Sequence, residues 1–463
     1  MGHRNGFKSS MRKLSRVLSL IFVVSVCLQA QTPPSYTITT MAGNGVAGFL
    51  GDAGAATDAN VNFPMGIATD TAGNVFIADQ LNHRIRKVTI DGVISTVAGN
   101  GTSGFSGDAA AATSAMLQYP CAVAVDSAGN LFIADTLNRR IRKVATGGTI
   151  TTVAGSSNVG FSGDGGKATE ASIILPVGVA VDTAGNIYFS DISSNVVRKV
   201  GTDGNISTFA GNGTAGFFGD GGPAVNAQLS SPEGLVVDGA GNVYIADVMN
   251  HRIRKVAADG TITTIAGSGF TRGFAGDGGP AVKAVLNYPY GIARDSSGNL
   301  FIADLGNNRI RMIRTDGTIV TVAGNGTFGD QGDGGGARSA QFRFPHSVAV
   351  DGAGRIAVSD NQNSRIRRLT PVSQTQNNAP PLISSSGIVR AGSEAWVEIY
   401  GWNLAADAPD GTKVSVSGQD ALVSYVSPNQ VNAKVPSTVG SGLQGITVTT
   451  SAGTSEPYTI AVE

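Results

Sequence analysis

A repeated unit constrains the fold of this 463-residue chain more than any other feature. The consensus of the copies contains a Gly-Asp-Gly-Gly-like turn, called the Asp-Gly turn below, a Pro-x-Gly-Ile-Ala-x-Asp pattern, an Ile-Ala-Asp triplet, an Asn-His-Arg-Ile-Arg-Lys-Val run and a closing Thr-Ile-Thr-Thr-Val-Ala-Gly, from which single copies depart. One proline anchors each copy, at a spacing of 56 or 57 residues: Pro64, Pro120, Pro176, Pro232, Pro289 and Pro345. Repetition at this period predicts a β-propeller or a solenoid.

Four short β-like runs, separated by turns, fill each repeat. In the first repeat these runs are Gly66–Asp70, Val75–Asp79, Arg84–Val88 and Ile94–Ala98. Gly73 and Gly92 lie in the turns, where a tight hairpin needs the positive φ that glycine adopts freely. Four antiparallel strands per repeat are typical of a propeller blade. The first run is rich in small residues, so we expect it to be the innermost strand, where the blades converge.

The two ends of the repeated region complement each other. The last repeat stops after Arg365–Leu369 and has no closing strand behind it, whereas a matching run, Thr37–Gly43, precedes the first repeat. A closed ring explains this offset, because the N-terminal strand then completes the sixth blade and removes exposed sheet edges. The sequence predicts an all-β fold, a six-bladed β-propeller over residues 36–370 closed by the N-terminal strand.

The run after each Ile-Ala-Asp resembles a known family. Residues Asn82–Val88 and Asn250–Val256 both read Asn-His-Arg-Ile-Arg-Lys-Val and resemble the NHL repeats of bacterial extracellular proteins. The resemblance covers residues 36–370 and implies a propeller. The third repeat departs from the pattern, because Val196 replaces the first arginine and only Arg198 remains.

The period ends after Thr370, and a second domain is expected. Residues 371–380 are polar and bounded by prolines, as a linker should be. Residues 381–463 alternate apolar and polar positions in about seven short runs, a pattern that predicts a β-sandwich. Segments such as Glu398–Leu404 and Tyr425–Asn432 resemble the Ig-like modules that end many secreted acidobacterial proteins. The resemblance implies an Ig-like sandwich but no chemistry.

The first thirty residues have the pattern of a signal peptide. Five basic residues precede the apolar run Val17–Leu28, which is shorter than the stretch of about 20 residues that spans a bilayer. Ala30 is a suitable last residue before cleavage, and lipid attachment at Cys27 is the alternative. We therefore expect a protein that is secreted or on the exterior of the cell envelope, with no transmembrane segment in the mature form.

Cleavage after Ala30 would change the charge and the cysteine count. The mature chain would have a net charge of −5, which argues against a nucleic-acid partner, since such binding neutralises phosphates with clustered basic residues. Only Cys121 would remain, so no intramolecular disulfide is expected. Stability must then come from a large buried core.

The aspartates of the Asp-Gly turns have two possible roles. They are Asp52, Asp108, Asp164, Asp220, Asp277 and Asp333. Calcium needs six to eight oxygen ligands, and each turn supplies one carboxylate, so we favour an aspartate that caps the short helix that follows. The sixth turn differs, because Asp330 replaces the phenylalanine of the other copies. Asp330 with Asp333 is the best candidate for a calcium ion, although we expect no cofactor.

Two further charged positions recur in nearly every repeat. They are the aspartate of each Ile-Ala-Asp triplet, such as Asp79, and the arginines of Arg-Ile-Arg, such as Arg84 and Arg86. A catalytic residue is usually needed once, so sixfold repetition indicates a structural network. Functional residues should instead lie where the copies differ.

The residue after each anchoring proline differs in every copy. These residues are Met65, Cys121, Val177, Glu233, Tyr290 and His346. Each opens an innermost strand, so we expect all six at the mouth of the central channel, as a ligand-binding site. Cys121, Glu233 and His346 are metal-ligand types, which leaves a metal ion as an alternative there, with Glu233 as a candidate ligand.

The residues after each Ile-Ala-Asp triplet also vary and should lie on the same face. Some are apolar, such as Leu81, Leu137 and Met249, and are either packed or open to a partner. Arg338, Arg343 and His346 are expected to form a positive spot near the sixth blade.

Two classes of function remain. The favoured one is a secreted, non-enzymatic binding or scaffold protein that recognises a glycan or a protein through the loop-rich propeller face. No Gly-x-Ser-x-Gly motif is present, and Cys121 has no evident base partner. The alternative is an enzyme similar to the propeller sugar lactonases or lyases, with a metal in the central channel. A purely structural surface module is a third possibility.

Overall fold

The computed structural model describes most of the chain beyond its N-terminal segment. The described residues are 34–269, 272–372, 382–391, 394–402, 404, 412–427, 430–450, 453–455 and 458–462. The expected signal segment, residues 1–30, lies outside them, as do residues 373–380 of the expected linker. None of the helices within the described ranges is long and apolar enough to cross a membrane.

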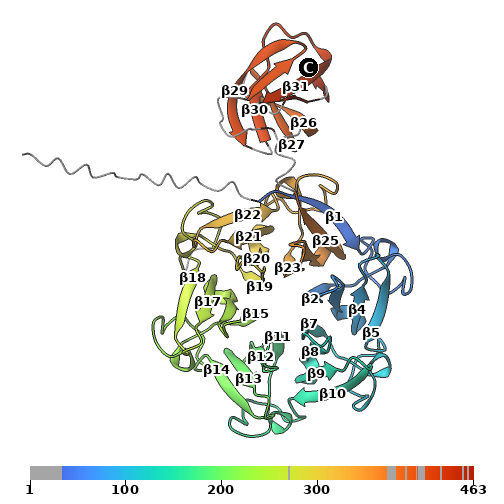
Figure 1. Cartoon of the computed structure of the whole chain (residues 1–463), viewed down its shortest axis with the longest axis vertical. Helices are drawn as coiled ribbons and strands as arrows, with labels where there is room; N and C mark the ends of the chain where they lie inside the picture. Colours follow the sequence, from blue (N-terminus) through green and yellow to red (C-terminus); the bar gives the residue numbers. More distant parts are fainter. Residues whose placement is uncertain are drawn as a thin grey trace, which may run out of the picture. The chain divides into compact units, whose positions relative to one another are not determined.

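The repeats fold into sheets of four antiparallel strands, an all-β arrangement typical of a propeller (Figure 1). The strands nearest the centre are β2 (Pro64–Thr69), β7 (Pro120–Val125), β11 (Pro176–Val181), β15 (Pro232–Val237), β19 (Pro289–Arg294) and β23 (Pro345–Val350). The second strands are β3 (Val75–Asp79), β8 (Leu131–Asp135), β12 (Ile187–Asp191), β16 (Val243–Asp247), β20 (Leu300–Asp304) and β24 (Ile356–Asp360). In the first repeat the inner strand begins two residues before the predicted run, because Pro64 already pairs with Asp79.

The outer strands complete each sheet. The third strands are β4 (Arg84–Val88), β9 (Arg140–Val144), β13 (Val196–Val200), β17 (Arg252–Val256), β21 (Arg309–Ile313) and β25 (Arg365–Pro371). The fourth strands are β5 (Ile94–Ala98), β10 (Thr149–Ala154), β14 (Ile206–Ala210), β18 (Ile262–Ala266), β22 (Ile319–Ala323) and β1 (Tyr36–Ala42). A two-residue strand, β6 (Ala110–Ala111), adds to the edge of β10.

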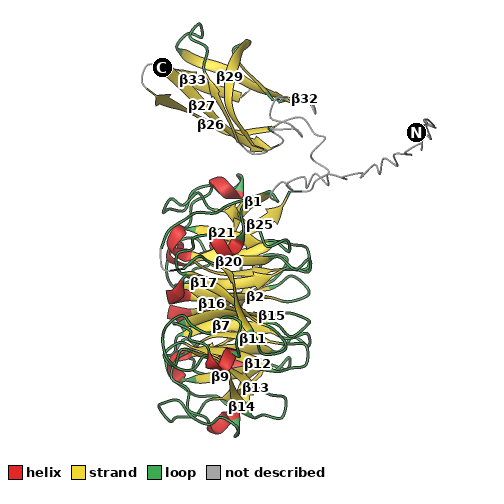
Figure 2. Ribbon diagram, turned by 90° about the vertical axis from the view of Figure 1, so that its left-hand side faces the viewer, coloured by secondary structure: helices red, strands yellow, loops and turns green. Residues whose placement is uncertain are grey.

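Short 3-10 turns connect the strands (Figure 2). One group follows the Asp-Gly turns: η1 (Ala56–Asp58), η3 (Ala112–Ser114), η5 (Ala168–Glu170), η6 (Ala224–Asn226), η8 (Ala281–Lys283) and η10 (Ala337–Ser339). The other group follows the second strands: η2 (Gln80–Asn82), η4 (Thr136–Asn138), η7 (Val248–Asn250), η9 (Leu305–Asn307) and η11 (Asn361–Asn363). The second group lies at the end of the sheet where the inner strands begin, since Pro64 pairs with Asp79 directly before η2.

Glycine in the inner strands lets the backbones approach each other closely. A Cβ atom on Gly66 would lie 2.7 Å from Cα of Ala122 on the neighbouring inner strand. On Gly178 it would lie 2.0 Å from the carbonyl oxygen of Glu233. The small residues of the first run are thus required by the packing of adjacent sheets, as the sequence pattern predicts.

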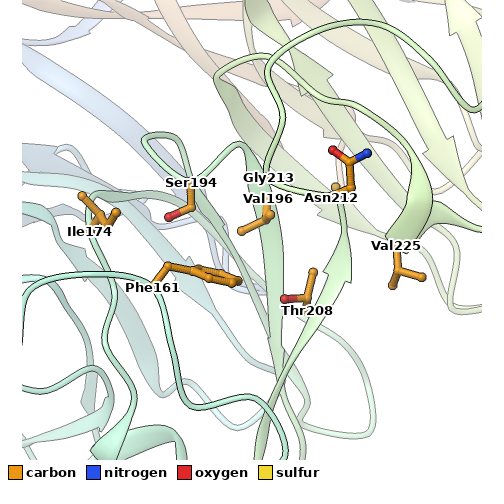
Figure 3. Close-up of a pocket in the computed structure, with 9 residues that line it drawn as sticks. Phe161, Ile174, Ser194, Val196, Thr208, Asn212, Gly213 and Val225 are labelled. Carbon is orange, nitrogen blue, oxygen red and sulfur yellow. The ribbon is translucent and has the colours of Figure 1, made fainter.

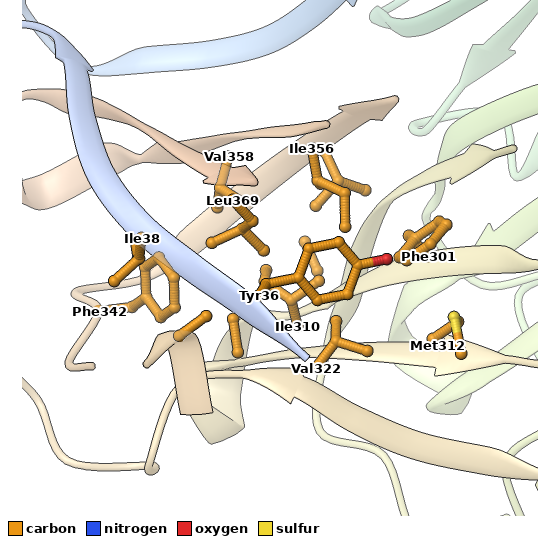
Figure 4. Packing of buried hydrophobic residues seen from close by; sticks show 14 of the residues in the cluster. Tyr36, Ile38, Phe301, Ile310, Met312, Val322, Phe342, Ile356, Val358 and Leu369 are labelled. Carbon is orange, nitrogen blue, oxygen red and sulfur yellow. The ribbon is translucent and has the colours of Figure 1, made fainter. Parts of the chain in front are cut away.

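The N-terminal strand β1 pairs with β25, the strand of the last repeat. The register joins Tyr36 to Pro371 and Ile38 to Leu369. Tyr36 and Ile38 are buried in a cluster with side chains from the last two sheets, including Phe301 (Figure 4). The N-terminal strand β1 therefore joins the sheet of the last repeat, as predicted. Both hydrogen bonds and apolar packing hold it there.

The C-terminal domain is a separate β-structure. Its strands are β26 (Leu382–Ala391), β27 (Glu394–Trp402), β28 (Lys413–Val416), β29 (Gln419–Ser427), β30 (Gln430–Lys434), β31 (Gly442–Thr450), β32 (Gly453–Thr454) and β33 (Tyr458–Val462). Alternate residues of these strands, such as Val397 with Ile399 and Val414 with Val416, form a common apolar core. This alternation is typical of an Ig-like domain with one buried face per sheet.

Candidate functional site

The inner strands meet around a small central cavity. Cys121, Val177, Glu233, Tyr290 and His346 line it, together with small residues that follow them in the strands. Its volume is about 50 Å³, far below the roughly 300–1,000 Å³ of ordinary ligand pockets. The structure thus brings five of the six variable positions together, but the space between them suits only a few water molecules.

Met65 is the sixth variable position and does not line the cavity. Its sulfur accepts a hydrogen bond from Nδ2 of Asn361 at 3.5 Å, and the same amide donates to the carbonyl of Pro64 at 2.9 Å. Met65 packs against the apolar cluster between the first two sheets. It is therefore a packing residue.

Glu233 and His346 are the two titratable side chains that face each other in the cavity. Nε2 of His346 lies 3.7 Å from Oε2 of Glu233, and the two side chains are only 13% and 15% exposed. The imidazole ring also packs against the ring of Tyr290, with centroids 4.7 Å apart. Burial raises the pKa of Glu233 to about 8 and lowers the pKa of His346 to about 4. Both groups are therefore held mostly neutral near pH 7.

Burial keeps Cys121 as a protonated thiol. Its sulfur accepts a hydrogen bond from Nε2 of Gln80 at 3.1 Å and lies 3.6 Å from the carbonyl oxygen of Tyr119. Burial raises the pKa of the thiol to about 11. A thiolate is the reactive and metal-binding form of cysteine, so the environment of Cys121 does not favour either role.

The residues at the cavity do not form a metal site. Within the part of the chain that the structure describes, no group of three His, Cys, Asp or Glu side chains converges on one point. Cys121, Glu233 and His346 all line the cavity, but zinc ligands must lie within roughly 2.0–2.3 Å of the ion. The donor set at the mouth therefore does not fit the metal alternative.

The aspartates of the Asp-Gly turns bind arginine and do not cap helices. Asp52 lies 2.7 Å from Nη2 of Arg86 and accepts a hydrogen bond from the hydroxyl of Thr96. Arg86 is completely buried and also pairs with Asp79 at 3.2 Å. The following 3-10 turn begins after Ala55, whose side chain cannot accept a hydrogen bond. The expectation of capping was wrong. The carboxylate of Asp52 pairs instead with the guanidinium group of Arg86, which is buried and needs a negatively charged partner.

The predicted network of Asp and Arg is present in the structure. Five of the six second arginines bridge the turn aspartate and the Ile-Ala-Asp aspartate of their own repeat. In the third repeat Arg198 pairs with Asp164, while the carboxylate of Asp191 accepts two backbone N–H groups. Charge pairing thus lets arginine be fully buried between the strands.

The proposed calcium ligands are occupied by arginine as well. Asp330 pairs with Nη1 of Arg365 at 2.8 Å. Asp333 pairs with Arg367 and accepts a hydrogen bond from the hydroxyl of Thr40. Each carboxylate therefore serves a different guanidinium group, which removes the physical reason for placing calcium between them.

Apolar side chains are exposed beside the inner-strand ends. Leu81, Leu137 and Met249 occupy the same position of their turns and are 39%, 42% and 50% exposed. The expected positive spot is smaller than predicted, because the neutral imidazole of His346 adds no charge. Arg343 instead places its guanidinium 4.6 Å from the ring centre of Phe328.

A second hollow in the propeller was not predicted from the sequence. It has a volume of about 530 Å³ and is lined mainly by residues of the third repeat, among them Phe161, Ser194, Val196 and Asn212 (Figure 3). The sequence contained its signal, because the third repeat is the copy in which valine replaces the first arginine. The sequence alone did not predict a hollow from this difference, because the position of the first arginines depends on the tertiary structure.

Family models match both the repeated region and the C-terminal domain. The model described as the teneurin NHL domain matches residues 46–104, 157–217, 214–273 and 269–331, and an NHL repeat model matches residues 342–369. An IPT/TIG domain model matches residues 383–462. The C-terminal domain is thus an Ig-like domain of the TIG type.

Curated relatives are similar to part of this chain. Teneurin-3 of Danio rerio is 31% identical over 311 residues, which cover 59% of this chain and 11% of that protein. Protein SUPPRESSOR OF QUENCHING 1, chloroplastic, of Arabidopsis thaliana is 28% identical over 274 residues, covering 56% of this chain and 26% of that protein. The aligned segments span only a small part of these relatives.

Solved structures share the fold. An auxiliary nutrient binding protein of Bacteroides ovatus superposes with a TM-score of 0.54 at 16% identity, covering 74% of this chain and 78% of that one. A protein of unknown function from Bacteroides thetaiotaomicron gives a TM-score of 0.53 at 19% identity, covering 73% and 76% of the two chains. Identities this low establish a common architecture only.

Proposed function

The chain belongs to the family of NHL-repeat propellers described by the teneurin NHL domain, and we propose that it is a secreted, non-enzymatic binding protein. In this proposal the six sheets are the blades of one closed ring, and a glycan or protein ligand binds the face where the inner strands begin. The observation that carries it is the gathering of the variable positions at that face, with Leu81, Leu137 and Met249 exposed beside the cavity.

The size of the central cavity favours a ligand that spans the face. A space of about 50 Å³ does not admit a sugar ring, since ligand pockets are several times larger. Exposed apolar side chains rimmed by polar residues are typical of contact surfaces between macromolecules. At the mouth, Cys121 supports the turn above it by accepting a hydrogen bond from Nε2 of Gln80.

A binding screen with a matched pair of variants tests this proposal. The full chain is applied to arrays of glycans and of secreted proteins, together with a triple variant, Leu81→Asp, Leu137→Asp and Met249→Asp. The control is Ile90→Asp, since Ile90 is 42% exposed in the β4–β5 turn at the opposite end of the strands. We expect the triple variant to lose the ligand and the control to keep it. Loss in the control alone, or no ligand for the wild type, would contradict the proposal.

The enzyme alternative rests on the buried pair of Glu233 and His346. Metal analysis of the purified protein before and after Glu233→Ala tests it directly. Stoichiometric metal that disappears in the variant would favour a propeller enzyme over a binding protein. We expect no such metal, because the donor set at the cavity does not converge.

Secretion is tested separately from binding. We propose that the protein leaves the cytoplasm, on the basis of the basic and apolar pattern of residues 1–30. Fractionation of producing cells into medium, envelope and cytoplasm would show where the chain accumulates. A cytoplasmic protein of full length would contradict this part of the proposal.

A further inference from the structure

The first arginine of the repeat occupies a defined site in the propeller, made of an aromatic ring and two backbone carbonyls. This site is called the arginine receptor below. The guanidinium carbon of Arg84 lies 3.6 Å from the ring centre of Phe49, and the group donates hydrogen bonds to the carbonyls of Asn82 and Asn100 at 3.1 and 2.8 Å. The same stacking is found for Arg140 on Phe105, Arg252 on Phe217 and Arg309 on Phe274, at 3.6 to 3.9 Å. Stacking on an aromatic face together with carbonyl acceptors suits a guanidinium group.

The sixth repeat keeps the arginine with a different partner. Asp330 stands where the other copies have phenylalanine, and it pairs with Arg365 at 2.8 Å. In the sixth repeat the carboxylate of Asp330 therefore takes the place of the aromatic ring in this receptor. Five repeats thus fill their receptor with their own arginine, and the third repeat has Val196 instead.

The third repeat retains the receptor without its arginine. Phe161 holds the aromatic position, and Ser194 and Asn212 stand at the positions of the two carbonyl acceptors. The hollow of about 530 Å³ opens between them, and Figure 3 shows Phe161, Ser194 and Asn212 around it.

The surroundings of one glycine show whether the space of the missing arginine is filled. A Cβ atom on Gly101 would lie 2.1 Å from Nη1 of Arg84. At the equivalent Gly213, the nearest atom is the carbonyl oxygen of Ser194 at 3.8 Å. The volume that a guanidinium group fills in the first repeat is thus open in the third.

A buried hydroxyl in the third-repeat pocket provides independent support for a polar guest. Ser194 is only 9% exposed and lines the pocket, and its Oγ has no hydrogen-bond partner among the described residues. In the other five repeats an asparagine takes this position, and in the first its amide binds Gly48 and Asp79. Buried polar atoms without a partner are costly, and a donor that enters the pocket would satisfy this one.

The charge balance of the third repeat also favours a cation. In the first repeat two arginines, Arg84 and Arg86, face the two carboxylates of the repeat. In the third repeat Asp164 and Asp191 face one arginine, Arg198. An added guanidinium group would restore the balance of the other copies.

We propose that the third-repeat pocket binds the guanidinium group of an arginine side chain that a partner polypeptide presents. No charged side chain lines the pocket, so nothing there would pair with the α-ammonium or α-carboxylate groups of a free amino acid. Strand register places the pocket at the same end of the sheet as the cavity, since Pro176 pairs with Asp191 and Asp191 with Val196. The choice of a polypeptide partner on this face rests on the proposed function, whereas guanidinium binding does not.

Titration of the full chain with small probes tests guanidinium binding by itself. The probes are Nα-acetyl-L-arginine methylamide, its lysine counterpart and free L-arginine, followed by calorimetry and by NMR shifts of Asn212 and Gly213. We expect saturable binding of the arginine amide, with the lysine amide at least about tenfold weaker because an ammonium group cannot stack and bridge two carbonyls in one plane. Equal binding of the lysine amide would overturn the guanidinium assignment. Tighter binding of free arginine would overturn the polypeptide source.

Two variants link the binding to the pocket. Val196→Arg supplies the arginine that the other copies have and should abolish binding while the protein stays folded by circular dichroism. Arg140→Val should open a matching receptor beside Phe105 in the second repeat and raise the stoichiometry from one to two. Unchanged stoichiometry in a folded Arg140→Val variant, or unchanged affinity in Val196→Arg, would refute the proposal. Should the amide bind while the arrays show no partner, the pocket assignment stands and the proposed function fails.

Discussion

The pair of Glu233 and His346 predicts how the stability of the propeller depends on pH. Burial raises the pKa of Glu233 from 4.5 to about 8. The unfolded chain releases this proton at a lower pH than the folded protein, so the stabilising contribution is complete below about pH 4.5 and is lost as the pH rises towards 8. Replacement of Glu233 by glutamine, which is neutral at every pH, should remove this loss.

The size of the effect follows from the pKa shift. One pKa unit corresponds to about 1.4 kcal/mol, so the wild type should lose about 4 kcal/mol relative to Glu233→Gln between about pH 5 and about pH 9. His346 has the opposite dependence: burial lowers its pKa from 6.5 to about 4, and its contribution is lost as the pH falls through that range. Both proteins contain His346, so its contribution cancels in the comparison.

Urea unfolding over this pH range measures the difference. Both tryptophans, Trp396 and Trp402, lie in the C-terminal domain, so tryptophan fluorescence follows that domain and tyrosine fluorescence follows mainly the propeller. Glu170→Gln is the matched control, because Glu170 is the other glutamate of the propeller and its side chain is 72% exposed. Parallel pH curves for the wild type and Glu233→Gln would refute the reasoning, as would an equal effect of Glu170→Gln.

Three further substitutions test the packing of the propeller by urea unfolding at neutral pH. Asp135→Asn should cost about 3 kcal/mol by weakening the pairing of buried Arg142, and a loss below about 1 kcal/mol would contradict the network. Ile38→Ala should cost about 2–5 kcal/mol, since Ile38 is fully buried where β1 joins the last sheets; an unchanged midpoint would mean that β1 is not needed. Gly178→Ala should destabilise strongly because its Cβ would lie 2.0 Å from a carbonyl oxygen, while Gly239→Ala, with open space around it, should be neutral.

Much of the fold could be predicted from the repeat. The prolines, turn glycines and β-branched runs placed the strands to within about two residues, since local turn chemistry and alternation act within a few positions of the chain. The offset between Arg365–Leu369 and Thr37–Gly43 predicted the pairing of β1 with β25. The comparison of copies also identified five of the eleven residues that line the central cavity.

Other properties depended on distances that no sequence pattern contains. The metal alternative at Cys121, Glu233 and His346 required convergence within a bond length, and the side chains do not converge. The role of Asp52 was misread as a helix cap, because the buried guanidinium of Arg86 comes from a strand more than thirty residues later. Contacts of this kind follow from how sheets pack, which alternation alone does not describe.

The sequence by itself determined the repeated architecture and showed where its copies differ, because the same local pattern recurs at a fixed spacing. Only the tertiary structure decided what those differences mean. It reduced the mouth of the inner strands to a space of about 50 Å³, and it turned the replacement of arginine by Val196 into an open receptor. The reason is physical: a missing side chain becomes a pocket only when the groups that surrounded it in the other copies stay in place.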